Sequence, residues 1–197
     1  MKSIRKTIGG IGNLMFKQAY LYAQMRDGHI PDVYVQSEKY WKKYGEEIKS
    51  MFSDGIGFLP YVAIHVRRGD YSDTDFYVNL CKTDYYKKAV KKFKDKKFLV
   101  FCKDRQDRIK DEVDREWCKE YFDKLLGEDN YQIMDNDTDI EDLNMMASCE
   151  GHIMANSSFS WWAAYLNHNW NKRIICPKKW FTDGVQRCEL LDTWEKI

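Results

Sequence analysis

Residues 61–70 read YVAIHVRRGD, an apolar and mostly β-branched run that ends in two arginines, a glycine and an aspartate. Pro60 precedes the run and Gly69 follows it, so the pattern predicts a buried strand over residues 61–66. Side chains alternate along a strand, which places His65 and Arg67 on one face and Val66 on the other. Ligands of parallel α/β sheets bind beyond the carboxyl ends of the strands, where both polar residues are expected to lie.

Strands and helices alternate through the rest of the chain. Short segments at 3–8, 98–102, 131–134, 152–155 and 173–176 are interpreted as further strands, and apolar periodicity predicts helices at 13–27, 85–93, 115–126, 140–149 and 158–167. Strands separated by helices indicate βαβ crossovers and a mainly parallel α/β sheet. Glycines 55 and 57 and Pro60 mark a boundary between a reduced N-terminal lobe, 1–58, and a Rossmann-type domain, 59–197.

Composition excludes several classes of protein. The 197 residues have a mean hydropathy of -0.67 and no long apolar run, which excludes a membrane span. A net charge of +1 gives no general electrostatic case for nucleic acid. No apolar stretch follows the charged start, so we expect no secretory signal. Six scattered cysteines without a CxxC pair indicate free thiols in a reducing, cytoplasmic setting.

The paired arginines of this strand end suit a diphosphate. Guanidinium groups carry a permanent charge and paired donors, so Arg67 and Arg68 are candidate ligands of such an anion. Gly69 permits a sharp exit from the strand, and Asp70 is expected to pair with an arginine and orient it. The alternative is an arginine–aspartate structural network beside a buried histidine.

A second candidate site lies at residues 156–162, NSSFSWW, between a predicted strand and a predicted helix. Ser157 or Ser158 is a natural N-cap. The N–H groups of that first helical turn can equally hold a phosphate, with help from the helix dipole. Trp161 and Trp162 are interpreted as core residues.

A third candidate is the glycine-rich turn of residues 9–13, GGIGN. Its spacing fits neither the GxGxxG fingerprint nor the P-loop. It can provide a close backbone approach to a ligand, with Asn13 at the start of a helix.

These stretches resemble one known family. HVRRGD at 65–70 resembles the HxRRGD motif of α-1,2-fucosyltransferases, glycosyltransferase family 11, and GGIGNLMF at 9–16 resembles that family's GGLGNQMF opening. The stretch 156–166, together with the upstream Asp142-Leu143, is similar to its third motif. Lesser matches lie at 116–119 and 177–181. Leu14 replaces the usual glutamine, and the segment between the first two motifs is shorter than in typical members.

The resemblance implies a GT-B-like pair of facing Rossmann-like lobes, here with a complete donor lobe and an abridged acceptor lobe. It implies an inverting transferase that moves L-fucose from GDP-β-L-fucose to a glycan hydroxyl, such as the 2-hydroxyl of galactose. It implies neither a metal nor another cofactor. The shortened lobe leaves open a protein that binds a GDP-sugar without transferring it, or a transferase that uses another nucleotide sugar.

The resemblance also suggests roles for single residues. Arg67 would hold the pyrophosphate and stabilise it as it leaves, and Asp73 or Asp75 is the candidate general base, although both also fit an exposed polar loop. The remaining donor-site candidates are His65 and Arg68 beside the nucleotide, Asp142 at the guanine, Asn156, Ser157, Ser158 and Phe159 at the helix start, and Gly10 and Asn13 near the fucose.

Two further patterns have competing interpretations. Residues 135–139, DNDTD, contain DxD patterns that in a metal-dependent transferase would carry a divalent ion, but Asp139 is more simply an N-cap. Seven lysines between Lys87 and Lys97 are interpreted as a solvated helix face, with peripheral contact to anionic lipid as the alternative. No aromatic stacking motif accompanies them, so nucleic acid is not expected as a partner.

Overall fold

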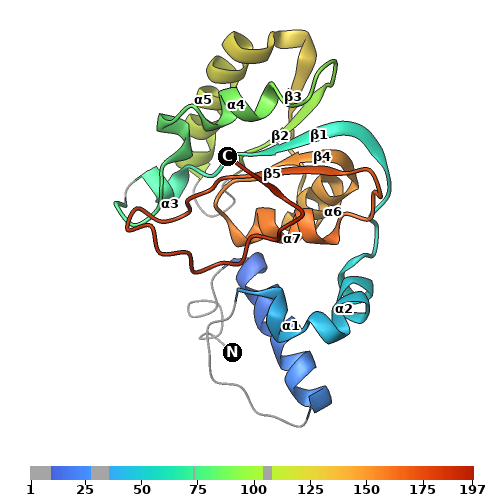
Figure 1. The fold of residues 1–197 in the computed structure, drawn as a ribbon. Helices are drawn as coiled ribbons and strands as arrows, with labels where there is room; N and C mark the ends of the chain where they lie inside the picture. Colours follow the sequence, from blue (N-terminus) through green and yellow to red (C-terminus); the bar gives the residue numbers. More distant parts are fainter. Residues whose placement is uncertain (1–9, 28–35, 73, 104–107) are drawn as a thin grey trace.

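The computed structural model describes residues 10–27, 36–72, 74–103 and 108–197 (Figure 1). Its helices are α1 (Ile11–Asp27), α2 (Gly45–Phe52), α3 (Gly69–Ser72), α4 (Tyr85–Val90), α5 (Arg108–Leu126), α6 (Asp139–Ser148) and α7 (Ser158–Leu166). Its strands are β1 (Leu59–His65), β2 (Phe98–Phe101), β3 (Tyr131–Ile133), β4 (Cys149–Ile153), β5 (Arg173–Cys176) and β6 (Glu195–Lys196). The strand predicted at 3–8 lies outside the described residues.

The strands form one sheet in the order β3-β2-β1-β4-β5-β6, and every pairing within it is parallel. This is the strand order of a Rossmann-type sheet. The prediction of a parallel α/β domain is therefore confirmed. Strand β4 begins at Cys149, earlier than predicted, and β6 was not predicted because two residues carry no periodic signal.

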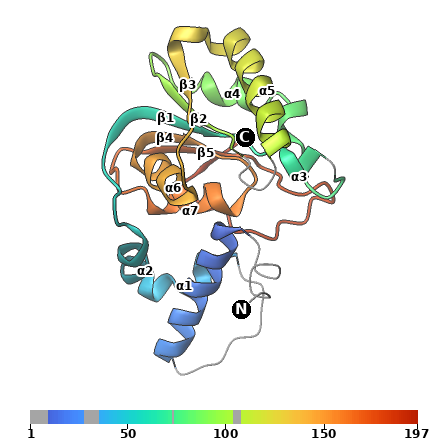
Figure 2. The same ribbon diagram turned by 180° about the vertical axis from the view of Figure 1, so that it is seen from behind.

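Helices cover both faces of the sheet, as Figures 1 and 2 show. Alternation along β1 sends Ile64 toward α4 and α5, where it joins a core with Tyr86 and Phe122. Ala63 points the other way and joins the core built with α6 and α7. Both faces are buried, which explains why the strands read as continuous apolar runs rather than alternating ones.

The N-terminal helices form a further layer against α7 (Figure 1). The ring of Phe16, on α1, lies 4.7 Å from the ring of Trp161 and 5.1 Å from that of Trp162, between ring centroids. Trp41 stacks on Trp162 at 5.9 Å. Both tryptophans of the NSSFSWW stretch are fully buried, which confirms them as core residues. Residues of the proposed N-terminal lobe thus share one hydrophobic core with α7, and the division at residue 58 stays a prediction.

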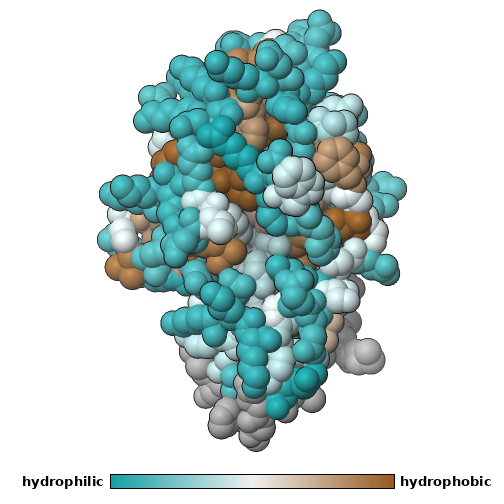
Figure 3. Space-filling view, turned by 45° about the vertical axis from the view of Figure 1, so that its right-hand side comes forward, coloured by the Kyte–Doolittle hydropathy of each residue, from teal (hydrophilic) through white to brown (hydrophobic). Residues whose placement is uncertain are grey.

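The surface is mainly hydrophilic, and apolar side chains emerge in separate patches on the face of Figure 3. Helix α4 ends at Val90, earlier than predicted, so of the seven exposed lysines only Lys87 and Lys88 lie on a solvated helix face, opposite the buried Tyr86 and Ala89. Within the described part of the chain, no helix combines the length and apolar character needed to cross a bilayer.

Candidate functional site

The chain order of the strands reverses between β1 and β4. Ile64 of β1 pairs with Ile153 of β4, so the segments that follow these strands leave the sheet side by side at its carboxyl edge. One segment carries the two arginines, and the other leads into α7. In Rossmann-type sheets, such a reversal opens the crevice in which nucleotides bind.

His65 ends β1 and contacts the start of α7. Its ring centroid lies 5.6 Å from that of Phe159, so the two predicted motifs meet. Burial, followed by the charge of Arg67 and the neighbouring His152, lowers the pKa of His65 to about 3. The imidazole is therefore neutral at physiological pH. Its Nδ1 is buried and has no hydrogen-bond partner among the described residues.

Arg67 follows β1 and is half-buried. Its guanidinium lies over the ring of Tyr71, 5.5 Å from the ring centroid. Tyr71 in turn stacks on Tyr77 with centroids 4.1 Å apart, and Tyr77 pairs through its backbone with Phe181. A layered aromatic support of this kind restricts the guanidinium at the crevice.

Arg68 is held differently. Its Nε donates to Asp114 of α5 at 2.7 Å, the other oxygen of Asp114 accepts from the Gly69 backbone at 2.9 Å, and the guanidinium lies over Trp117. The arginine–aspartate network weighed from the sequence therefore exists, with Asp114 as one partner. The side chain of Asp70, the partner first expected, lies outside the described residues. These contacts anchor the loop that carries Arg67.

Helix α7 follows β4 at the carboxyl edge of the sheet, and no side chain of the described residues caps its start. Ser157 occupies the N-cap position with extended backbone, yet its hydroxyl makes no capping hydrogen bond. The first-turn N–H groups, including those of Ser158 and Phe159, have no intrahelical acceptor, which is the usual geometry of an anion site. Asn156 is occupied elsewhere, because its amide donates to the carbonyls of Val78 and Trp180.

The glycine loop packs against this helix start. A Cβ placed on Gly12 would lie 2.5 Å from the backbone nitrogen of Phe159 and 2.7 Å from the hydroxyl of Ser158, so only glycine fits. The carbonyl of Gly10 accepts from the backbone N–H of Asn13 at 3.0 Å. Residues of the first and third motifs are thus in contact.

Asp142 lies in the first turns of α6, which follows the carboxyl end of β3. It is buried and accepts a hydrogen bond from Asn136 at 2.8 Å. Helix α6 leads from β3 to β4 and packs against α7, and its first turns follow the carboxyl edge of the sheet.

Of the two candidate general bases, the described residues include only Asp75. Asp75 is exposed, and its backbone carbonyl accepts from the Thr182 hydroxyl at 2.5 Å. Asp73 lies outside the described residues.

The DNDTD stretch does not assemble a metal site in the described structure. No three His, Cys, Asp or Glu side chains gather there or elsewhere among the described residues. Asp135 pairs with Lys103 at 2.6 Å and with Arg115 at 3.4 Å. The prediction that Asp139 caps α6 is wrong, because Thr138 is the N-cap and forms a capping box with Glu141.

Several residues that hold the site's side chains in place were not predicted from the sequence. Gln36 is buried, donates to the side-chain oxygen of Asn13 at 2.7 Å, and accepts from the Glu189 backbone N–H at 2.8 Å. Asp114 and Tyr71 were missed in the same way. Gln36 and Asp114 act across long sequence separations that no local pattern marks, whereas Tyr71 lies only four residues after Arg67.

Comparison with known proteins agrees with this geometry. The sequence profile described as glycosyl transferase family 11 matches residues 34–194. An α-1,2-colitosyltransferase of Escherichia coli is 30% identical over 166 residues, covering 74% of this chain and 54% of that protein. The O-antigen biosynthesis glycosyltransferase WbnK of Escherichia coli is 29% identical over 138 residues, covering 67% and 43%. The chain thus spans about half the length of these relatives. By the extent of the profile match, the chain belongs to glycosyl transferase family 11.

Proposed function

We propose that this protein is an inverting, metal-independent transferase that moves L-fucose from GDP-fucose to a glycan hydroxyl, the 2-hydroxyl of a galactoside. The observation that carries the proposal is that Arg67 and the start of α7 follow two neighbouring parallel strands, with the ring of His65 lying 5.6 Å from that of Phe159. No side chain of the described residues caps that helix start. A nucleoside diphosphate is the ligand that such a pair suits.

The chemistry follows from where charge develops. As the acceptor hydroxyl attacks the anomeric carbon, the bond to the diphosphate breaks and negative charge grows on GDP. The Arg67 guanidinium and the α7 amides would stabilise that charge, which would favour the transition state over the bound substrate. Loss of one such contact is expected to cost roughly 10²–10³ in rate.

His65 would contribute a neutral hydrogen-bonding group. Its lowered pKa keeps the imidazole uncharged, so it does not serve as the acid that protonates the leaving group. Its buried Nδ1 without a described partner would instead meet a polar atom of the nucleotide. Asp142 remains the proposed reader of guanine, and Asn13 the proposed neighbour of the sugar.

Asp75 is the proposed general base that accepts the proton of the acceptor hydroxyl. Its replacement by asparagine should lower turnover and leave GDP affinity unchanged, because Asp75 would touch the acceptor rather than the donor. Unchanged turnover would remove Asp75 from the mechanism.

The donor sugar has two candidates. The α-1,2-colitosyltransferase relative favours a colitosyl group as the alternative to fucose and supports transfer to a 2-hydroxyl. Parallel reactions with GDP-fucose and with a nucleotide-activated colitose, each with the same galactoside acceptor, would decide between them. Activity that disappears with EDTA and returns with Mn²⁺ would favour a metal-dependent transferase instead.

The donor site is tested by GDP titration calorimetry on the wild type and on Arg67→Ala. The variant should bind GDP roughly 10–100-fold more weakly, as expected for a lost hydrogen bond to a charged group. Arg26→Ala is the matched control, because Arg26 pairs with Glu47 near the far end of α1. Equal affinity in all three proteins would remove the donor-site assignment.

A non-catalytic GDP-sugar binder is separated by a second readout. Release of GDP from GDP-fucose should rise when a galactoside is added. Binding of GDP without acceptor-dependent release would favour the binder, which is the class that the abridged N-terminal lobe leaves open.

A further inference from the structure

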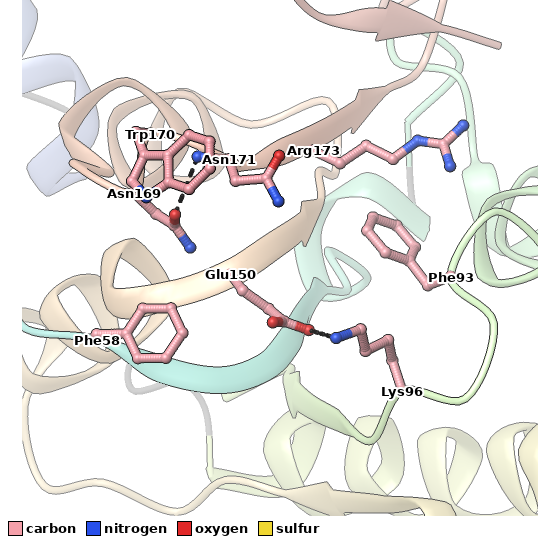
Figure 4. Close-up of a pocket in the computed structure, with 8 residues that line it drawn as sticks. All are labelled: Phe58, Phe93, Lys96, Glu150, Asn169, Trp170, Asn171 and Arg173. Atoms are coloured by element: carbon pink, nitrogen blue, oxygen red, sulfur yellow. Dashed lines mark hydrogen bonds and ion pairs between the residues drawn. The ribbon is translucent and has the colours of Figure 1, made fainter.

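A hollow opens at the amino-terminal edge of the sheet, opposite the edge that carries Arg67 (Figure 4). It has a volume of about 300 Å³, and its lining includes Phe58, Phe93, Glu150, Asn169, Trp170 and Arg173; we call it the amino-edge hollow. Glu150 lies near the start of β4, and Arg173 begins β5. Strand β1 has seven residues, so this hollow lies roughly 20 Å from the crevice beside Arg67.

Exposed aromatic rings border the hollow. The side chain of Trp170 is 93% exposed and that of Phe58 is 63% exposed, which is unusual for rings of this size. Figure 4 shows Trp170 and Phe58 on the same side of the hollow and Phe93 across from them. Such rings offer flat apolar faces to a small ligand.

Neutral polar groups lie beside the rings. The side-chain oxygen of Asn169 accepts from the backbone N–H of Asn171 at 3.1 Å. The amide nitrogens of Asn169 and Asn171 point toward the side where Glu150 lies (Figure 4). None of the described residues accepts a hydrogen bond from either nitrogen, so both amides can bind hydroxyl groups.

Each charged side chain beside the hollow has a partner of opposite sign. Lys96 pairs with Glu150 at 2.6 Å. Arg173 and Lys92 both pair with Glu195, each at 2.7 Å. A phosphate or carboxylate would compete with these carboxylates for the same cations, so the hollow favours an uncharged ligand.

We propose that the amino-edge hollow binds a neutral saccharide, as a glycan site distinct from the transfer site. A pyranose has an apolar C–H face that stacks on an aromatic ring and hydroxyl groups that match amides. The volume lies at the small end of typical ligand sites and suits a mono- or disaccharide. The proposal is independent of the donor-site assignment, because it uses none of its residues.

Trp170 itself provides the probe. Of the seven tryptophans, Trp170 is exposed, Trp117 is half-buried and the other five are buried. Iodide quenching of tryptophan emission therefore reports mainly on Trp170. Lactose, N-acetyllactosamine and cellobiose would each be titrated to about 50 mM, a range that covers millimolar affinity. We expect at least one of them to protect Trp170 from iodide.

Variants locate the binding. Calorimetry should show affinity for that disaccharide reduced at least about fivefold in Asn171→Ala and in Trp170→Ala. Val113→Ala, which removes an exposed apolar side chain on α5, should bind like the wild type. GDP affinity should be unchanged in all three variants, which also shows that they fold.

Three results would overturn the proposal. The first is no protection by any of the three sugars, and the second is binding that Trp170→Ala leaves intact. The third is protection of Trp170 only by vesicles containing phosphatidylglycerol, or only by raised protein concentration. That result would assign the surface to anionic lipid or to a second copy of the chain.

Discussion

Replacing Gly12 with alanine tests the contact between the glycine loop and the start of α7. The added Cβ would lie 2.5 Å from backbone atoms of both Ser158 and Phe159, whereas ordinary contact begins near 3.4 Å. The two helix starts must therefore separate by about 0.9 Å. Overpacking of this kind lowers the free energy of unfolding by about 1–3 kcal/mol. The greater helix propensity of alanine over glycine offsets up to about 1 kcal/mol of that loss.

We therefore expect a net loss of about 1–2 kcal/mol in the free energy of unfolding. For a chain of this length, that loss lowers Tm by roughly 2–8 °C. The shift also displaces the α7 amides, so GDP affinity should fall about tenfold. Thermal and urea unfolding measure the first effect, and calorimetry with GDP measures the second.

Gly57→Ala is the matched control, because nothing lies within 4 Å of the added Cβ. Its stability should stay within about 1 kcal/mol of the wild type, with unchanged GDP affinity. If Gly12→Ala and Gly57→Ala behave alike in both assays, the glycine loop does not support the helix start as described.

Three further predictions concern stability and reactivity. Asp114→Ala leaves Arg68 without its buried partner and should cost about 3–5 kcal/mol in urea unfolding; a loss below about 1 kcal/mol would contradict the role of this pair. The pKa values of His65 and His152 are lowered by burial to about 3, so between that pH and about 6.5 the unfolded chain binds more protons and stability should fall as pH falls. The slope is up to about 1.4 kcal/mol per pH unit for each histidine, and His152→Gln should reduce it; a urea midpoint that is the same at pH 7 and pH 5 would refute this. Burial raises the pKa of Cys149 and Cys176 to about 12, so Ellman's reagent at pH 8 should label these thiols slowly until urea unfolds the chain, and labelling at the rate of free cysteine would contradict their burial.

The sequence by itself determined the class of fold and the edge on which to look for the site. Continuous apolar runs such as 61–66 and 98–102 predicted buried strands, and the helices between them predicted parallel crossovers. The NSSFSWW stretch predicted a strand-to-helix turn with buried tryptophans, and the structure confirms both. These features are local, because they depend on backbone preferences and periodicity within a few residues.

Only the tertiary structure decided which polar side chains support the fold and which face the crevice. Arg67 and Arg68 are adjacent and chemically identical, yet Arg68 is held by Asp114, which α5 brings from a distant part of the chain. Asn156 bonds two distant carbonyls, and Gly12 meets Phe159 through the packing of α1 on α7. Parallel crossovers join segments far apart in sequence, so such partners depend on the packed core rather than on any local pattern.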